Sequence, residues 1–430
     1  MELRSRLKSS CRTFSCAVLI CGTTVVGRGA SAADDDNNRG FASFSAAAVN
    51  TTPTLNFAAK TGVALQQLDT HFPGILSNLS GAVSANEIIP DLPPDAIPPL
   101  DEPLFVNAAA ASVSNGAMVL GVALNGKAFA YPIGIMNFHE IVHHFAGDQE
   151  VTATYCPLTN SGALIEARAI SFGNSGALYN NNVVMYDRET RSLWSQMAVG
   201  CIWGERAGEH LRLLPMAHTT WKAWKALYPQ TRVLSTNTGH NRNYDFDPYI
   251  ASGYTRNRDI FFPQTVPIDG RLHPKDMVFG LAQNGQARAY PYELLERTSA
   301  VNDRFAEQEI LVFFDPDAQL ALGYLRQTED QILHFEVADN SPGESPLFAD
   351  IETGSTWNIL GQGIDGPLAG HQLSPIAAYS AYWFGWASFW QDTEIWDGET
   401  LLPTEKQDGE TLPPSAVQQQ SWGEVKRRMR

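Results

Sequence analysis

A long internal repeat is the feature that most limits what this chain of 430 residues can fold into. The run MVLGVALNGKAFAYP at 118–132 returns as MVFGLAQNGQARAYP at 277–291, with ten of fifteen positions identical. Two shorter matches follow in the same order: DRETRSLW at 187–194 with DIETGSTW at 350–357, and GERAGEHL at 204–211 with GPLAGHQL at 366–373. The offsets of 159 to 163 residues are far longer than a solenoid period. We therefore expect two diverged tandem copies of one domain-sized unit.

The local patterns within each copy predict strands joined by short turns. Asn-Gly turns at 125–126 and 284–285 indicate a β-hairpin at the start of each copy. The alternating segment EVTATY at 150–155 and the apolar runs GALIEA and NVVMYD predict further strands. TTWKAWKALYP at 219–229 predicts a short helix that ends before its proline. The expected fold class is α+β and β-rich, mostly antiparallel, with short helices.

A second helix is predicted directly after the first hairpin. Ile135, Phe138, Val142 and Phe145 fall on one stripe at helical spacing. That helix would carry the sequence His139-Glu140-Ile141-Val142-His143 across its surface.

The N-terminus has the features of an export signal. Basic residues precede the mostly apolar stretch 14–26, and Ala30-Ser31-Ala32 supplies small residues for cleavage. The apolar stretch is too short to span a membrane, so no stable membrane insertion is expected after cleavage. We expect a periplasmic or secreted protein divided into a signal peptide at 1–32, a variable lead-in at 33–85, a Pro-rich extended segment at 86–116, a first repeat with the site at 117–255, a connector at 256–275, a second, scaffold-like repeat at 276–397 and a flexible tail at 398–430.

Charge and cysteine usage exclude some classes of protein. The net charge of −16 would repel nucleic acid and anionic membranes. Only Cys156 and Cys201 of the five cysteines lie beyond the signal. Two cysteines do not make a disulfide framework, and the sequence leaves open whether they form one bond or stay free.

Several long motifs resemble those of one bacterial family. They include DAIPPLDEPLF at 95–105, HEIV at 139–142, TYCPLTNS at 154–161, the run at 172–194, TTWKAWK at 219–225 and NRNYDFDPY at 241–249. On these motifs the chain resembles the DUF3179 family of exported proteins, over most of its length beyond the signal. The chain departs from the family pattern at His143-His144, where the family usually has Asn-Asp, and at Thr159-Asn160. The resemblance implies a family but no particular reaction.

The H-E-x-x-H pattern at 139–143 is that of zinc metalloproteases. On a helix, histidines at i and i+4 face one metal ion, and the glutamate activates its water. The repeat argues against this interpretation, because His143-His144 aligns with Asn302-Asp303 in the second copy. No third ligand follows at a familiar spacing. His139 and Glu140 alone can still belong to a site.

Cys156 is the sharpest candidate for chemistry. It ends a predicted strand, and Thr159 three residues later could donate a hydrogen bond to a thiolate. A thiolate with an imidazole such as His139 can also hold a transition metal, which is the candidate cofactor. On alternation alone, Cys156 faces away from the apolar side of its strand. The alternative is a small buried side chain at a strand end.

The segment 173–182 is predicted to be a loop rich in glycine, serine and asparagine. Such a loop can present Asn174, Ser175, Asn180 and Asn182 to a ligand, or can simply bond its own backbone. The second copy has no matching text and has Asp315 in place of Cys156, so the site is expected in the first copy.

Three functions remain open on the sequence. One is a thiol- or metal-dependent, perhaps redox, enzyme with Cys156, His139 and Glu140 as catalytic residues and Cys156 and His139 as metal ligands. Another is a non-catalytic extracytoplasmic protein that binds a small molecule or a protein partner through Thr159 and the 173–182 segment. The third is the zinc metalloprotease.

Overall fold

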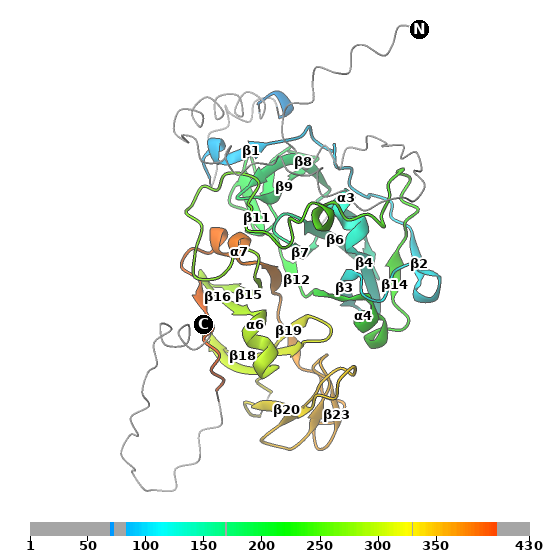
Figure 1. Ribbon diagram of the computed structural model, residues 1–430, viewed down its shortest axis with the longest axis vertical. Coiled ribbons are helices and arrows are strands. Elements are labelled where there is room, and N and C mark those ends of the chain that lie inside the picture. Colours follow the sequence, from blue (N-terminus) through cyan, green and yellow to red (C-terminus); the bar gives the residue numbers. More distant parts are fainter. Residues whose placement is uncertain (1–68, 73–82, 168–169, 329, 402–430) are drawn as a thin grey trace, which may run out of the picture.

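The computed structural model describes residues 69–72, 83–167, 170–328 and 330–401 (Figure 1). The predicted signal peptide, most of the lead-in and nearly all of the tail lie outside these residues. The described residues form several mostly antiparallel sheets with a few short helices, which confirms a β-rich fold. Among them, no helix is both long enough and apolar enough to cross a membrane.

The first half of the fold carries three sheets. The hairpin sheet has the order β13-β3-β4-β14-β2, and its β14 runs parallel to β4. The second sheet has the order β12-β7-β6-β5, and the third has the order β1-β8-β9-β10-β11. The strands are β1 (Ile88–Pro90), β2 (Phe105–Asn107), β3 (Met118–Leu124), β4 (Lys127–Pro132), β5 (Ile141–Ala146), β6 (Gln149–Cys156), β7 (Ser161–Glu166), β8 (Phe172–Tyr179), β9 (Asn182–Asp187), β10 (Leu193–Ser195), β11 (Gly200–Trp203), β12 (Leu213–Leu214), β13 (Ala217–Thr220) and β14 (Arg232–Leu234).

The second half carries three sheets with matching strand orders. They are β25-β15-β16-β26, with β26 parallel to β16, then β24-β19-β18-β17, and β20-β21-β22-β23. The strands are β15 (Met277–Gln283), β16 (Gln286–Pro291), β17 (Ala300–Phe305), β18 (Gln308–Asp315), β19 (Leu320–Leu325), β20 (Phe335–Asp339), β21 (Leu347–Asp350), β22 (Thr356–Trp357), β23 (Gly363–Asp365), β24 (Ser374–Pro375), β25 (Tyr379–Tyr382) and β26 (Glu394–Ile395).

Short helices occupy equivalent places in the two halves. α3 (Ile133–His139) and α6 (Tyr292–Thr298) directly follow the two hairpins, and α4 (Trp221–Leu227) and α7 (Trp383–Phe389) follow β13 and β25. Between the halves lies α5 (Pro248–Ala251), and short 3₁₀ turns η2 (Ala85–Glu87) and η3 (Ala108–Ala110) precede the first hairpin. Figure 1 shows the two hairpins, β3–β4 and β15–β16, in separate parts of the molecule.

A tryptophan packs onto a glycine in each hairpin sheet. A Cβ atom on Gly121 would lie 2.3 Å from the ring of Trp224, and one on Gly280 would lie 2.4 Å from the ring of Trp386. Both indoles are buried, and their N–H groups bond Thr231 in the first half and Thr393 in the second. The bare glycine surface therefore sets how closely α4 and α7 approach their hairpins.

The two halves exchange hydrogen bonds at their seam. The amide of Thr220, at the end of β13, donates to the carbonyl of Ala318 across 3.3 Å. The amide of Tyr382, at the end of β25, donates to the carbonyl of Thr159 across 2.8 Å. Each half thus presents the end of one strand to a turn of the other half.

The helix predicted across 135–145 is wrong in its second part. α3 ends at His139, and Glu140 then adopts a left-handed conformation with φ 58° and ψ −27°. Residues from Ile141 onward form β5, which pairs with β6 from Ile141↔Thr154 to Ala146↔Gln149. The β-branched and aromatic side chains that suggested a helical stripe instead serve as alternating strand residues.

The predicted loop at 173–182 is also wrong, because most of it is strand. Phe172–Tyr179 forms β8, paired with β9, with a bulge between Asn174 and Ala177. Only Asn180 and Asn181 form the turn, and both have positive φ. The Pro-rich segment lies against the edge of this region, because Asp91 and Leu92 donate their amides to Gly176 O.

We predict that Gly121→Ala destabilises the protein by about 1–3 kcal/mol, because the new methyl group would overlap the buried Trp224 ring. The measurement is the free energy of unfolding from urea denaturation. Gly116→Ala is the matched control, since no atom lies within 4 Å of its added Cβ. A loss no larger than that of the control would contradict the packing argument.

Candidate functional site

His139 is held at the end of α3 by two hydrogen bonds. Its Nδ1 lies 2.8 Å from the carbonyl of Pro98, and its Nε2 lies 2.7 Å from the hydroxyl of Tyr244. The carbonyl can only accept, so Nδ1 carries the proton and Nε2 accepts from Tyr244. Burial lowers the pKa of His139 to about 4, so the ring is neutral at pH 7. Both nitrogens are therefore used within the protein.

His143 lies on a different element and makes different bonds. Its Nε2 donates to the carbonyl of Phe172 across 2.7 Å, and its Nδ1 accepts from the hydroxyl of Thr152. The H-E-x-x-H pattern thus spans a helix end, a left-handed residue and a strand, so its histidines do not share one helical face. Among the described residues, no group of three or more His, Cys, Asp or Glu side chains is arranged to hold a metal ion.

The second half shows what His143-His144 replaces. Asn302, aligned with His143, donates its amide to the carbonyl of Phe335, just as His143 donates to that of Phe172. Asp303, aligned with His144, accepts from the hydroxyl of Tyr290, while His144 bonds the hydroxyl of Tyr131. Both histidines therefore do the bonding that asparagine and aspartate do elsewhere in the chain. The predicted surface histidine pair on a helix is wrong, since both lie partly buried on β5.

Cys156 meets Glu140 and Asn174 at a small cavity of about 40 Å³. Its side chain is buried, and its thiol donates to the carbonyl of Asn181. Burial, followed by the nearby Glu140 carboxyl, raises the pKa of Cys156 to about 11. Cys156 packs in a different core cluster from Val151, Ala153 and Tyr155, as alternation predicted, but it is buried there and not exposed.

Glu140 is also neutral at pH 7. Burial raises the pKa of its carboxyl to about 8, although the amide of Asn174 donates to it across 2.8 Å and partly offsets that rise. The cavity therefore contains a protonated acid beside a protonated thiol. It has room for a few water molecules.

The predicted ligand-binding residues are bonded to the protein itself. The amide of Asn182 contacts Thr159, and its carbonyl oxygen accepts from the backbone amide of Met197. The hydroxyl of Ser175 donates to the carbonyl of Val184. The carbonyl oxygen of Asn180 accepts from Thr265, and Asn174 bonds Glu140 and Gly176. These side chains stabilise β8, β9 and their turn, and they do not line the larger pocket. Cys156 and Cys201 are both free thiols, on different sheets.

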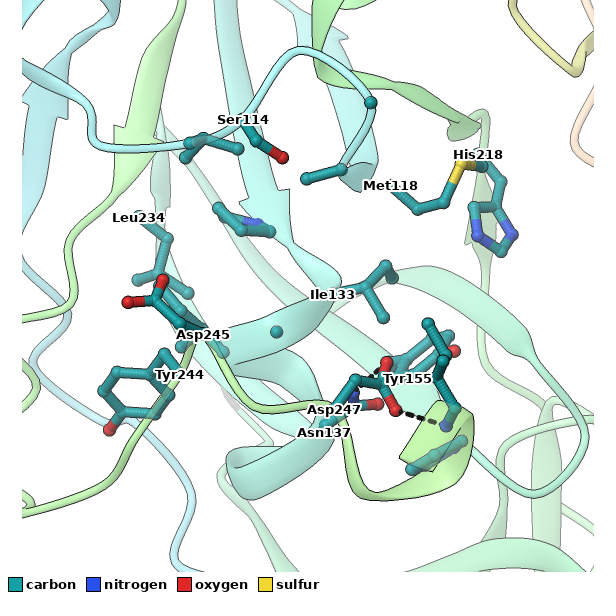
Figure 2. A pocket seen from close by; sticks show the side chains of 18 of the residues that line it. Ser114, Met118, Ile133, Asn137, Tyr155, His218, Leu234, Tyr244, Asp245 and Asp247 are labelled. Carbon is teal, nitrogen blue, oxygen red and sulfur yellow. Dashed lines mark hydrogen bonds between the residues drawn. The ribbon is translucent and has the colours of Figure 1, made fainter. Parts of the chain in front are cut away.

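A larger pocket of about 590 Å³ lies beside this region, a size that suits a small organic molecule (Figure 2). Its walls come from the loop before β3, the start of α3, the end of β6, β13 and the segment that contains α5. Met277, Tyr292, Gln319 and Tyr382 of the second half complete it. The pocket thus lies at the seam where the halves exchange hydrogen bonds.

His218 is the unusual side chain in this pocket. It lies on β13 opposite Leu120, is 5% exposed, and has no hydrogen-bond partner for its Nδ1. Burial lowers its pKa to about 4, so the ring is uncharged at pH 7. A buried polar atom without a partner is costly, so this imidazole is an exception among the buried polar groups of the fold.

Asp247 is a second polar side chain on the lining of the pocket. One carboxylate oxygen caps α5 by accepting from the amides of Tyr249 and Ile250, and the other accepts from Asn137 across 3.0 Å, as Figure 2 shows. The hydroxyl of Tyr155 donates to Asn160 nearby. Burial, and then the charges of Tyr382 and Asp247, raises the pKa of Tyr155, so its hydroxyl stays protonated.

Sequence reasoning did not identify His218, Tyr155 or Asp247. The signal for His218 was a difference between the repeats, because the aligned residue in the second half is Ser380. The signal for Asp247 was its place in the NRNYDFDPY motif, beside a proline that starts a helix. Neither signal indicates a cavity by itself.

We predict that His143→Asn changes the free energy of unfolding by no more than about 1 kcal/mol, because the asparagine amide can bond the carbonyl of Phe172 as Asn302 bonds Phe335. His143→Ala, which leaves that carbonyl without a side-chain donor, should cost about 1–3 kcal/mol. Loss of zinc binding or of a peptidase activity in His143→Asn would support the metalloprotease instead.

We predict that Cys156 of the native protein reacts with iodoacetamide only slowly at pH 7. A thiol with a pKa of about 11 is ionised to roughly one part in 10⁴ at that pH, and this one is buried. Peptide mapping should find the label after denaturation, or in native protein only as the pH rises. An added thiol at the exposed Asn115, made as Asn115→Cys, is the reactive control. Rapid labelling of native Cys156 at pH 7 would favour the thiol enzyme.

The comparisons with known proteins give a family and no activity. The family model described as "Protein of unknown function (DUF3179)" matches residues 94–393. Neither a curated protein nor a solved structure matches the chain. The matched span covers most of both halves, all residues that line the larger pocket and most of those that line the small cavity. The chain belongs to the DUF3179 family.

Proposed function

We propose that the protein binds a small molecule in the 590 Å³ pocket at the seam between its two halves. The observation that carries this proposal is the pocket itself, whose lining combines segments of both halves and the buried imidazole of His218. Apolar walls with a few polar groups aimed inward are typical of small-molecule sites. The N-terminal signal pattern supports a place outside the cytoplasm, in the periplasm or the medium.

The proposal includes two diverged copies of one unit, which the matched contacts support. In the first half, Asp187 accepts from Thr190 and from the indole of Trp194. In the second half, Asp350 accepts from Thr353 and from the indole of Trp357 in the same way. The distances agree within about 0.2 Å. Apart from the edge strands β1 and β2, which have no counterpart, the three sheets of each half have the same strand order. One ancestral unit would account for both.

The second copy then serves as an internal control for the site. There, Tyr292 follows the hairpin, and its hydroxyl bonds the hydroxyl of Ser380 across 2.7 Å. The aligned residues of the first copy are Ile133 and His218. Isoleucine has no hydroxyl, so the imidazole is left without the partner that the serine has. A ligand group would take the place of the missing hydroxyl.

A thiol-dependent enzyme is the second candidate, because Cys156, Glu140 and Asn174 meet at one cavity. Against it stand the burial of the thiol and its raised pKa. His139 does not join this cavity, so a metal held by Cys156 and His139 gains no support from the geometry. The metalloprotease is not proposed.

We predict that Ile133→Tyr combined with His218→Ser, which gives the first copy the pair found in the second, abolishes binding without lowering stability. The tyrosine should occupy the part of the pocket beside residue 218 and bond the serine, as Tyr292 bonds Ser380. The probe is 3-phenylpropanol, and the readout is ligand-observed NMR together with the melting temperature. Ile268→Tyr, on an exposed residue that does not line the pocket, is the control.

Binding in wild type and the control, with loss in the double variant, would support the proposal. Equal binding in all three proteins would place the probe elsewhere and contradict it. A melting temperature lowered by more than a few degrees would show that the two positions are not equivalent.

A further inference from the structure

The pocket has an uneven distribution of charge. Asp245 and Asp247 line it, and no lysine or arginine does. Asp245 is exposed at the rim, and Asp247 is partly buried. The lining has one ionisable nitrogen group, the imidazole of His218, and its pKa of about 4 leaves it neutral at pH 7. The potential inside is therefore negative, and a net charge of −16 reinforces it.

Positive groups near the pocket do not offset these carboxylates. Lys275 lies behind Tyr382, with its ammonium 5.4 Å from that ring, and donates to the carbonyl of Tyr254. Burial lowers its pKa to about 7, so it carries only part of a charge at neutral pH. The positive charge of Arg242 acts to lower the pKa of Tyr244 and that of His139, but Arg242 does not line the pocket.

The remaining polar surface suits a cation. Five tyrosines line the pocket, and the faces of their rings attract ammonium groups. The carboxylate of Asp247 accepts three hydrogen bonds within the protein and has about four acceptor positions, so one remains.

Resting on the proposed function, we infer that the ligand class is a protonated amine on an apolar body. An anionic ligand would bring its charge toward two carboxylates, with no cation on the lining to receive it. A neutral ligand would leave the remaining acceptor position of Asp247 without a charged partner. The amine avoids both problems, and its apolar body matches the walls formed by residues such as Met118 and Leu234.

The test compares three probes that share a phenylpropyl skeleton: 3-phenylpropylamine, 3-phenylpropanol and 3-phenylpropanoate. Dissociation constants are measured by ligand-observed NMR at pH 7, in low and in high salt. The variants are Asp245→Asn, Asp245→Asn with Asp247→Asn, and Glu205→Gln, an exposed change of equal charge away from the pocket. Asparagine also caps helices, so the double variant should keep α5.

We expect the amine to bind wild type at least about tenfold more tightly than the alcohol, with the carboxylate weakest. The preference should shrink to within about threefold in the double variant and in high salt, and should stay unchanged in Glu205→Gln. Asp245→Asn alone should reduce the preference for the amine by a smaller amount. If the double variant does not fold, this single variant provides the test of the aspartates.

The other outcomes separate the two claims. Alcohol or carboxylate binding as tightly as the amine, with all binding lost in the Ile133→Tyr, His218→Ser protein, would keep the pocket and overturn the amine. No binding of any probe to wild type would overturn the proposed function and this inference together. An amine preference that survives in the double variant would overturn the role of the two aspartates.

Discussion

The contact between a glycine in each hairpin and the tryptophan of a following helix is the constraint on which the rest of the structure depends. With no Cβ on Gly121 and Gly280, the rings of Trp224 and Trp386 lie directly on the sheet backbone. The helix α4 that carries Trp224 follows β13, so the same contact fixes the strand on which His218 lies. A side chain at Gly121 would overlap the Trp224 ring, so α4 could not keep its present distance from the hairpin. The pocket wall formed by β13 thus depends on a packing contact outside the pocket.

The seam between the halves places the pocket. The carbonyl of Ala318 accepts from the amide of Thr220, and the carbonyl of Thr159 accepts from the amide of Tyr382. Each half therefore contacts the other through the same kind of hydrogen bond. Thr219 adds its hydroxyl to the carbonyl of Ala318. Because Tyr382 both makes this bond and lines the pocket, a ligand there would contact the residues that hold the halves together. Ligand binding would therefore be expected to stabilise the assembly of the halves as well as the site.

Sequence reasoning predicted the β-rich class, the hairpins and a short helix, but it misjudged the environment of one strand face. The Asn-Gly turns and the helix that begins at Trp221 follow from local rules, and the structure has a hairpin and a helix at those places. Alternation put Thr152 and Thr154 on the face away from the apolar side chains of β6, yet both are buried. Thr152 bonds His143 of the neighbouring strand β5, and Thr154 bonds Gln196, which follows β10 of another sheet. Alternation distinguishes two faces, but it cannot say whether the polar face meets water or another sheet.

The segment 135–145 shows a different limit. Ile135, Phe138, Val142 and Phe145 fit a helical period, but a left-handed residue at Glu140 divides them between a helix and a strand. Nothing in a glutamate predicts that conformation, since glycine or asparagine is the usual choice. The pocket could not be predicted from the sequence for a related reason, since residues as far apart in the chain as His218 and Tyr382 line it. Pairing across such distances is decided by tertiary packing.

A comparison of Glu140 with Ser299 separates a feature that both halves need for folding from features found in the first half alone. Glu140 has φ 58° and ψ −27°, and the aligned Ser299 has φ 55° and ψ −25°. Strain of this kind is often taken as a mark of function. Both halves have this conformation where a short helix turns into a strand, so the conformation is a requirement of that turn. What differs is the side chain that stands there. The first half has Glu140, Cys156 and His218 where the second has Ser299, Asp315 and Ser380. Selection for the fold alone would not require these differences, so they are the positions at which the function of the first half should be sought.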